Sequence, residues 1–239
     1  MATPIGLEHC LSFINCQLQP PHQPLVAYRN GRERRAITIS RQTGSGGHAV
    51  AEKLVALLQA RVPGQGGPWA VFDRNLVDKV LEQHHLPSRM AHFMPEDRIS
   101  EMSDTIDELF GLHPSSWALV RKSAETILHL AELGNVILIG RGAAVITRKL
   151  DFVFHVRLVG SLEKRVEYIQ KHRNLGAKAA RNLIQHEDLG RRRYLKKYFD
   201  KDIDDPLLYH LTVNTDLVPY EEAARMIADA VTTKAVAAT

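Results

Sequence analysis

Long apolar runs are missing from this sequence. The most continuous one, Val136 to Ile139, is cut short by Gly140 and Arg141, whereas a membrane-crossing helix needs roughly 20 apolar residues. The N-terminus has no basic start followed by an apolar stretch, so it does not resemble a secretory signal. We therefore expect a protein that makes no contact with a membrane and works in the cytoplasm.

Cysteine is scarce as well, since Cys10 and Cys16 are the only two. They form no C-x-x-C pair, and the 12 histidines, among them His84 and His85, show no metal-binding spacing such as H-E-x-x-H. We interpret both thiols as ordinary and the histidines as structural. No metal site within the protein is predicted.

The rest of the composition is that of a globular protein, with 44% hydrophobic and 24% charged residues. A formal net charge of +4 favours anionic ligands such as nucleotides, but it does not choose between a nucleotide and a nucleic acid. The length favours one large α/β domain.

The chain divides near residue 35. Residues 1–35 contain four prolines and end in a charged run, which predicts a poorly ordered extension or linker. Beyond it, over residues 36–239, strand-like and helix-like patterns alternate, which predicts a parallel sheet covered on both faces. Strands are expected at 36–40, 69–72, 136–140, 152–158 and 209–213, and helices at 49–58, 73–82, 116–133, 162–171, 177–198 and 220–232.

The stretch AITISRQTGSGGHAV, residues 36–50, has the outline of a phosphate-binding loop. Backbone N–H groups at a helix N-terminus that follows glycines can hold phosphates. A glycine turn between a strand and a helix is also a plain structural device, and both interpretations stay open. The candidate phosphate ligands are Thr43, Gly44, Ser45, Gly46, Gly47 and His48.

The loop departs from the motif G-x-x-x-x-G-K-[ST] at three positions. Arg41 stands at the first glycine, Gly47 at the lysine and His48 at the hydroxyl residue. Arg41 is either a solvated arginine at a strand end or the source of the charge that the lysine would have supplied.

Two further stretches carry candidate chemistry. Arg141, followed by Gly142, comes directly after an apolar strand, where ligands bind in parallel sheets, although an exposed arginine in a turn fits as well. The basic segment from Asp188 to Tyr198, with Arg191 in it, fits a solvated face, a nucleic-acid patch or a lid that brings positive charge to a phosphoryl group.

A smaller candidate is the pair Asp73 and Arg74. It follows a predicted strand and could meet an acceptor, while Asp73 would serve equally well as the N-cap of the next helix.

In their order and spacing these stretches resemble the cytidylate kinase-like family. The matching segments are Ile39-Ser40-Arg41, Gly44-Ser45-Gly46-Gly47, Phe72-Asp73-Arg74, Gly140-Arg141-Gly142-Ala143, His155-Val156-Arg157, Asp188-x-x-Arg191-x-x-Tyr194 and Asp205-Pro206 with Tyr209. The resemblance implies a P-loop nucleoside monophosphate kinase fold of three α/β/α layers, with a parallel central sheet, a helical acceptor-binding insertion and a lid near residues 173–200.

The implied reaction transfers the γ-phosphoryl group of ATP to CMP or dCMP with Mg²⁺. By position, the Thr43–His48 loop would wrap the ATP phosphates and Arg141 would hold the acceptor's phosphate. The residues implied in catalysis are Arg41, Asp188 and Arg191, and those implied in acceptor binding are Asp73, Arg74, Arg141 and Gly142.

The missing lysine keeps other functions open. The chain could be a catalytically weak nucleotide-binding regulatory module, or a kinase of another small acceptor. A nucleic-acid-binding protein is the least favoured alternative, because the basic segment contains no recognised nucleic-acid motif.

Overall fold

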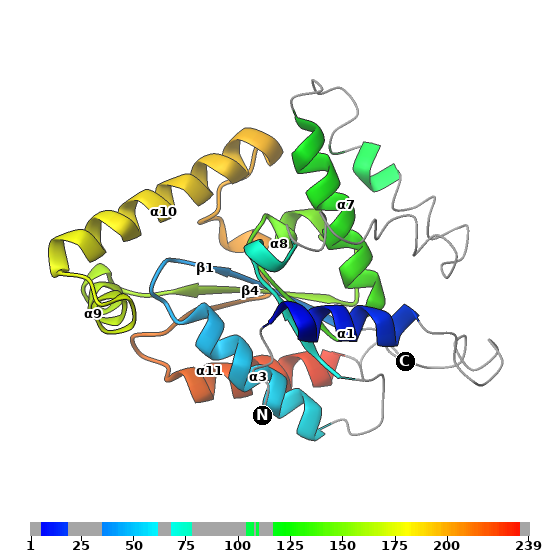
Figure 1. Cartoon of the computed structure of the whole chain (residues 1–239), viewed down its shortest axis with the longest axis horizontal. Helices are drawn as coiled ribbons and strands as arrows, with labels where there is room; N and C mark the ends of the chain where they lie inside the picture. Colours follow the sequence, from blue (N-terminus) through cyan, green and yellow to red (C-terminus); the bar gives the residue numbers. More distant parts are fainter. Residues whose placement is uncertain are drawn as a thin grey trace.

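The computed structural model describes residues 6–18, 35–61, 68–77, 104–107, 109 and 117–234. At its centre lies a five-stranded sheet in the order β2-β3-β1-β4-β5, in which every pair is parallel (Figure 1). The strands are β1 (Ala36–Arg41), β2 (Ala70–Phe72), β3 (Val136–Ile139), β4 (Val153–Val159) and β5 (Leu211–Asn214).

Successive side chains of each strand point to opposite faces of the sheet, so the core consists of two clusters. On β1, Ile37 and Ile39 face a layer made of α3 (Gly47–Arg61) and α11 (Tyr220–Lys234). The opposite face packs against α7 (Ala118–Leu133) and α8 (Ala143–Ile146). Figure 1 shows α3 and α11 below the strands and α7 and α8 above them. The predicted three-layer α/β/α architecture is confirmed.

The register brings the carboxyl ends of the central strands together. Ile39 of β1 pairs with Ile139 of β3, and Arg41 pairs with Leu158 of β4. The glycine loop that follows β1 and the Gly-Arg-Gly segment that follows β3 therefore lie at the same edge of the sheet, as expected for ligand sites of parallel sheets.

A helix in the N-terminal segment corrects one expectation. Residues 1–35 were expected to be a poorly ordered extension, but Leu7–Leu18 form helix α1. Its residues Cys10, Phe13 and Ile14 are at most 1% exposed and belong to the same core cluster as Phe72. The prolines misled the prediction because all four lie outside α1 and leave its apolar side chains free to pack.

The region expected to form the lid, residues 173–200, starts at the last residue of helix α9 (Leu162–Arg173) and consists mainly of α10 (Ala177–Phe199). Ser161 caps α9 by accepting a hydrogen bond from the N–H of Lys164, and Asn174 ends the helix in a left-handed conformation. In Figure 1, α10 extends along one side of the sheet, beyond the end of β1.

Smaller differences concern element boundaries. The strand expected at 209–213 is preceded by a 3₁₀ turn, Pro206–Leu208, which Asp205 caps through the N–H of Leu207, so β5 begins only at Leu211. Helix α3 starts at Gly47, two residues before its first expected apolar residue. The sequence sets no bounds for the implied acceptor-binding insertion, and residues 78–103, 108 and 110–116, which fill most of the stretch between β2 and α7, lie outside the described residues. Among the described helices, none is both long and apolar enough to cross a membrane.

Candidate functional site

The glycine loop between β1 and α3 is fixed by close packing. Gly44 and Gly46 have φ angles of 86° and 78°, a region that favours glycine. A Cβ at Gly46 would lie 2.4 Å from the ring of Tyr220, and one at Gly44 would lie 2.7 Å from the carbonyl oxygen of Arg165. The sequence therefore needs glycine at both positions in order to form this loop.

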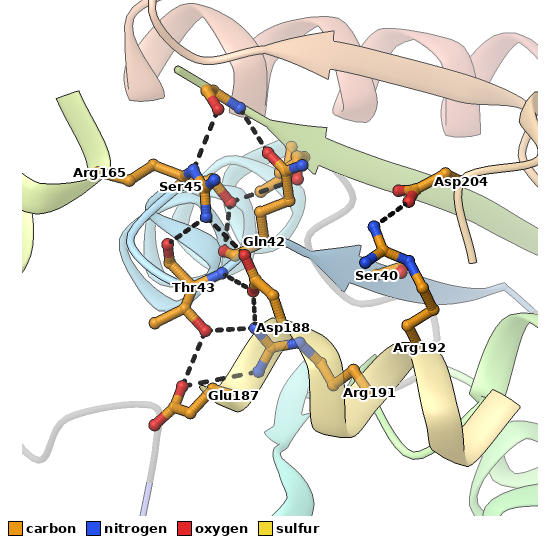
Figure 2. Close-up of polar contacts among 12 residues, drawn as sticks. Ser40, Gln42, Thr43, Ser45, Arg165, Glu187, Asp188, Arg191, Arg192 and Asp204 are labelled. Carbon is orange, nitrogen blue, oxygen red and sulfur yellow. Dashed lines mark hydrogen bonds and ion pairs between the residues drawn. The ribbon is translucent and has the colours of Figure 1, made fainter. Parts of the chain in front are cut away.

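Side chains within the loop hold its shape. Ser45 Oγ donates to the carbonyl of Gln42 at 2.8 Å, and the N–H of Gly160 donates to Gln42 Oε1 at 3.0 Å (Figure 2). Ser45 is only 1% exposed. The N–H of Ser45 also donates to the carbonyl of Gln42, at 3.2 Å, so both polar groups of Ser45 hold the loop itself.

Arg41 extends from the end of β1 across two glycines. A Cβ at Gly47 would lie 3.1 Å from Arg41 Cγ, and a Cβ at Gly140 would lie 2.2 Å from Arg41 Nη1. Burial, followed by the charge of Arg191, lowers the pKa of Arg41 to about 10, which still leaves it charged at neutral pH. Arg41 is thus a partly buried cation beside the loop, and not a solvated arginine at a strand end.

His48 and Asp73 face each other at the start of α3. His48 Nε2 lies 3.2 Å from Asp73 Oδ2, while Asp73 Oδ1 accepts the N–H of Leu76 at 2.9 Å. Burial alone would raise the pKa of Asp73, but these hydrogen bonds outweigh it and lower the pKa below its ordinary value. Asp73 therefore caps the helix, as considered from the sequence, and its side chain also lines the cavity described below.

The Gly140-Arg141-Gly142 segment has three consecutive positive φ angles, 84°, 54° and 73°. Arginine rarely adopts this conformation, and such backbone strain concentrates at functional sites. The turn leads into α8, where the N–H of Ile146 donates to the carbonyl of Gly142 at 3.0 Å. Arg141 is placed beside the cavity described below.

Helix α10 is joined to the loop through Thr43. The N–H of Thr43 donates to Asp188 Oδ1 at 2.8 Å, and its hydroxyl donates to Glu187 Oε2 at 2.8 Å (Figure 2). The guanidinium of Arg191 bonds both Thr43 Oγ1 and Asp188. The predicted lid residues Asp188 and Arg191 thus contact the predicted phosphate loop directly.

The sequence did not predict a role for Arg165, which contacts the glycine loop, the segment after β4 and helix α10. From α9 it donates to the carbonyls of Gly160 at 3.0 Å and Thr43 at 3.2 Å, and to Asp188 Oδ2 at 2.6 Å. It is 8% exposed. The only signal in the sequence was one arginine within a charged helix, where arginine usually faces solvent.

The sequence also did not predict a second hydrogen-bond network, which is centred on Arg157 and Asp204. Buried Arg157 donates to Ser40 Oγ at 2.8 Å and to Asp204 Oδ1 at 2.6 Å, and Arg192 of α10 donates to Asp204 Oδ2 at 2.7 Å. Tyr209 OH bonds Ser40 Oγ at 3.2 Å. The network ties α10 to the end of β1 through residues far apart in sequence, which local patterns cannot reveal.

A cavity of about 760 Å³ lies between the end of β1, the Gly140-Arg141-Gly142 segment and α10. Its cationic lining consists of Arg41, Arg74, Arg141, Arg173 and Arg191, and its carboxylates are Asp73 and Glu187. Five guanidinium groups against two carboxylates make the cavity suited to phosphate groups. Gly142, His48 and Tyr209 line it too.

Another cavity, of about 590 Å³, lies on the α9 side of the loop, where Gly44 forms part of its wall. Tyr168 stacks on His172, with ring centroids 3.9 Å apart, and meets Tyr220 edge-on at 6.0 Å. Lys164, Lys171 and Asp216 complete a mixed lining. Aromatic faces with polar groups around them suit a flat heterocycle.

The structure brings the sequence-predicted residues together. Of the acceptor-binding and catalytic candidates, Arg41, Asp73, Arg74, Arg141, Gly142 and Arg191 line the larger cavity, and Asp188 bonds the loop beside it. In the basic segment of α10, Arg191, Arg192 and Lys196 each have a carboxylate partner. Of these three, Arg191 lines the larger cavity, whereas the side chains of Arg192 and Lys196 are more than half exposed.

Within the described residues, no group of three or more histidine, cysteine or acidic side chains could hold a metal ion. The position of the usual loop hydroxyl is taken by His48, which faces Asp73.

Comparison with known proteins places this geometry in context. The sequence pattern of the cytidylate kinase-like family matches residues 36–217, more than half of the chain. The cytidylate kinase of Pyrobaculum islandicum is 26% identical over 198 residues, which cover 82% of this chain and 92% of that protein. The cytidylate kinase of Methanocaldococcus jannaschii is 24% identical over 169 residues, covering 70% and 94%.

A solved structure has a similar fold. It is an uncharacterized protein from Eubacterium ventriosum, with a TM-score of 0.56 and 20% identity, covering 84% of this chain and 99% of that one.

Proposed function

We propose that this chain, which belongs to the cytidylate kinase-like family, transfers the γ-phosphoryl group of ATP to a nucleoside monophosphate. The observation that carries the proposal is the placement of two cavities on either side of one glycine loop. Arg41 lies between this loop, at Gly47, and the end of β3, at Gly140. A phosphotransferase needs two nucleotide sites that meet at a phosphate-binding element, together with cations at the meeting point.

The donor is assigned to the loop and the smaller cavity. ATP phosphates would lie against the backbone of Thr43 to His48, and the adenine would lie near Tyr168 and Tyr220. Aromatic stacking stabilises a bound base without reading its edge, and Lys164 adds positive charge.

Arg41 is proposed to supply the charge that a loop lysine gives in related loops. Its guanidinium lies against Gly140, and both residues line the larger cavity. Charge stabilisation of the transferring group is the main contribution that a protein makes to phosphoryl transfer. Arg191, held by Thr43 and Asp188, is proposed to act on the same group from α10.

Mg²⁺ is proposed to enter with ATP. Asp73 and Glu187 are the carboxylates that could take part in its coordination or bind its water ligands. When bound, the ion would neutralise charge on the phosphate oxygens.

CMP or dCMP is the acceptor proposed first. Both curated relatives are named cytidylate kinase, and the larger cavity is cationic enough for a phosphate group. Arg141 would donate a bidentate pair of hydrogen bonds to that phosphate, with Arg74 and Gly142 beside it. The cytoplasm, where both nucleotides are available, stays the proposed location.

The acceptor site is tested with Arg141→Ala, compared with Arg148→Ala, an exposed arginine nearby that does not line the cavity. Calorimetry should show that Arg141→Ala weakens CMP binding by about 10- to 100-fold, the loss expected for charged hydrogen bonds, while ATP binding changes little. Arg148→Ala should bind both nucleotides normally. CMP affinity unchanged in Arg141→Ala would overturn the assignment.

A regulatory module that binds nucleotides with little turnover is the second candidate. Gly47 at the lysine position favours it. Turnover at ordinary kinase rates, about 1 to 100 per second, would refute it.

A further inference from the structure

Helix α1 packs against strand β2, although it precedes the first residue that the family pattern matches, Ala36. Cys10, Phe13 and Ile14 are as buried as the central strands. Figure 1 shows α1 crossing close to the short strand β2, and the core cluster that contains these three residues also contains Phe72. The helix is therefore an integral part of the domain.

Two contacts join α1 to the carboxyl end of β2. Cys10 Sγ donates a hydrogen bond to the carbonyl of Val71 at 3.4 Å. The ring of Phe13 meets Phe72 edge-on, with centroids 6.1 Å apart and an interplanar angle of 66°. Val71 and Phe72 are the two residues that immediately precede Asp73.

Strand β2 is the short edge strand that leads to Asp73. It consists of three residues and forms one edge of the described sheet, paired there with β3. The N–H of Ala70 points toward β3, where it donates to Asn135. Since successive residues of a strand alternate sides, the carbonyl of Val71 points to the outer edge, where the Cys10 thiol meets it.

Asp73 lies close enough to α1 for its charge to act on Cys10. Burial, followed by the negative charge of Asp73, raises the pKa of the Cys10 thiol to about 12, so the two groups are within electrostatic reach. Asp73 in turn contacts His48 and the N–H of Leu76 with the two oxygens of one carboxylate. Such a double contact demands accurate placement of the strand end.

We propose that α1 is a positioning element for the acceptor site, in which Phe13 and Cys10 fix the end of β2 so that Asp73 reaches both of its partners. The identity of the ligand rests on the proposed function, whereas the link from α1 to Asp73 does not.

The test uses the full-length chain with Phe13→Ala, the conservative Phe13→Leu, and Ile227→Ala as a control. Ile227 is a fully buried residue of α11 in the other core cluster. NMR titration reports the pKa of the Asp73 carboxyl, and steady-state kinetics report KM for CMP and for ATP separately.

In Phe13→Ala, the pKa of Asp73 should rise toward its ordinary value of 3.8 as its hydrogen bonds loosen. KM for CMP should increase by roughly 10- to 100-fold, the effect of an ångström-scale displacement, with KM for ATP nearly constant. Phe13→Leu should restore most of both values. Ile227→Ala should destabilise the protein without moving the pKa of Asp73.

A folded Phe13→Ala protein with an unchanged pKa of Asp73 would overturn the proposal. If Phe13→Ala does not fold, Cys10→Val, which replaces the thiol by an apolar group of similar size, is measured in the same way and decides by the same criterion. If the wild-type chain turns over no nucleoside monophosphate, the proposed function fails, while the NMR titration still decides the role of α1.

Discussion

The side chain of Arg41 occupies the space into which a side chain at Gly47 would grow. A Cβ at Gly47 would lie 3.1 Å from Arg41 Cγ and 3.5 Å from Arg41 Cβ. A side chain at position 47 would therefore crowd Arg41, which would have to shift to admit it. Arginine at the first loop position and glycine at the seventh form a matched pair, so the missing lysine does not mean that the site lacks a cation.

This pairing predicts the outcome of exchanging the two positions. Gly47→Lys alone should destabilise the protein by about 1 to 3 kcal/mol, because the added side chain overpacks the site against Arg41. The double variant Arg41→Gly with Gly47→Lys should recover both stability and ATP affinity. Thermal unfolding and calorimetry check the three proteins together. If Gly47→Lys alone is as stable as the double variant, the two side chains do not crowd each other.

The contact between α10 and the loop predicts a loss of stability in Asp188→Ala. That change leaves Arg165, whose side chain is 10% exposed, without its carboxylate. Breaking a fully buried pair costs roughly 3 to 5 kcal/mol, and we expect about 2 to 3 here because Asp188 is partly exposed.

The matched control is Glu167→Ala on α9, where both partners of the pair with Lys164 are more than 60% exposed. It should cost at most about 0.5 kcal/mol. Chemical denaturation of both variants checks the comparison, and equal losses would argue against a structural role for the Asp188 contact.

The lowered pKa of Asp73 predicts how the free energy of unfolding depends on pH. Because its pKa in the folded protein is lowered, the ionised carboxylate stabilises the fold fully above its ordinary pKa of 3.8, and this stabilisation is lost as pH falls below that value. Asp73→Asn keeps an N-cap side chain but removes the charge. Urea unfolding between about pH 6 and pH 3 should therefore be less pH-dependent in the variant than in the wild type. Parallel curves would mean that Asp73 gains no such stabilisation.

The sequence was most informative where local pattern decides structure. The apolar runs of β1, β3 and β4 predicted the sheet because such continuous runs suit strands buried on both faces. The loop and the Gly140-Arg141-Gly142 turn were recognisable because glycine is needed where φ is positive.

Contacts between distant segments could not be predicted in the same way. Arg165 and Arg157 look like surface arginines in their local sequence, and only the fold brings them to Asp188 and Asp204. Helix α1 was missed because the surrounding prolines dominate the pattern, whereas its helical structure depends on burying Phe13 against Phe72.

The central claim, phosphoryl transfer with Arg41 in place of the loop lysine, is tested most directly by one assay. The purified protein is incubated with ATP, Mg²⁺ and each of a panel of nucleoside monophosphates, and ADP formation is followed beside an Arg41→Ala control. We expect turnover with CMP or dCMP that falls about 100- to 1,000-fold in the control, the cost of removing one charged contact to the transferring group. Turnover that is unaffected by Arg41→Ala, or no turnover although ATP binds, would contradict the account.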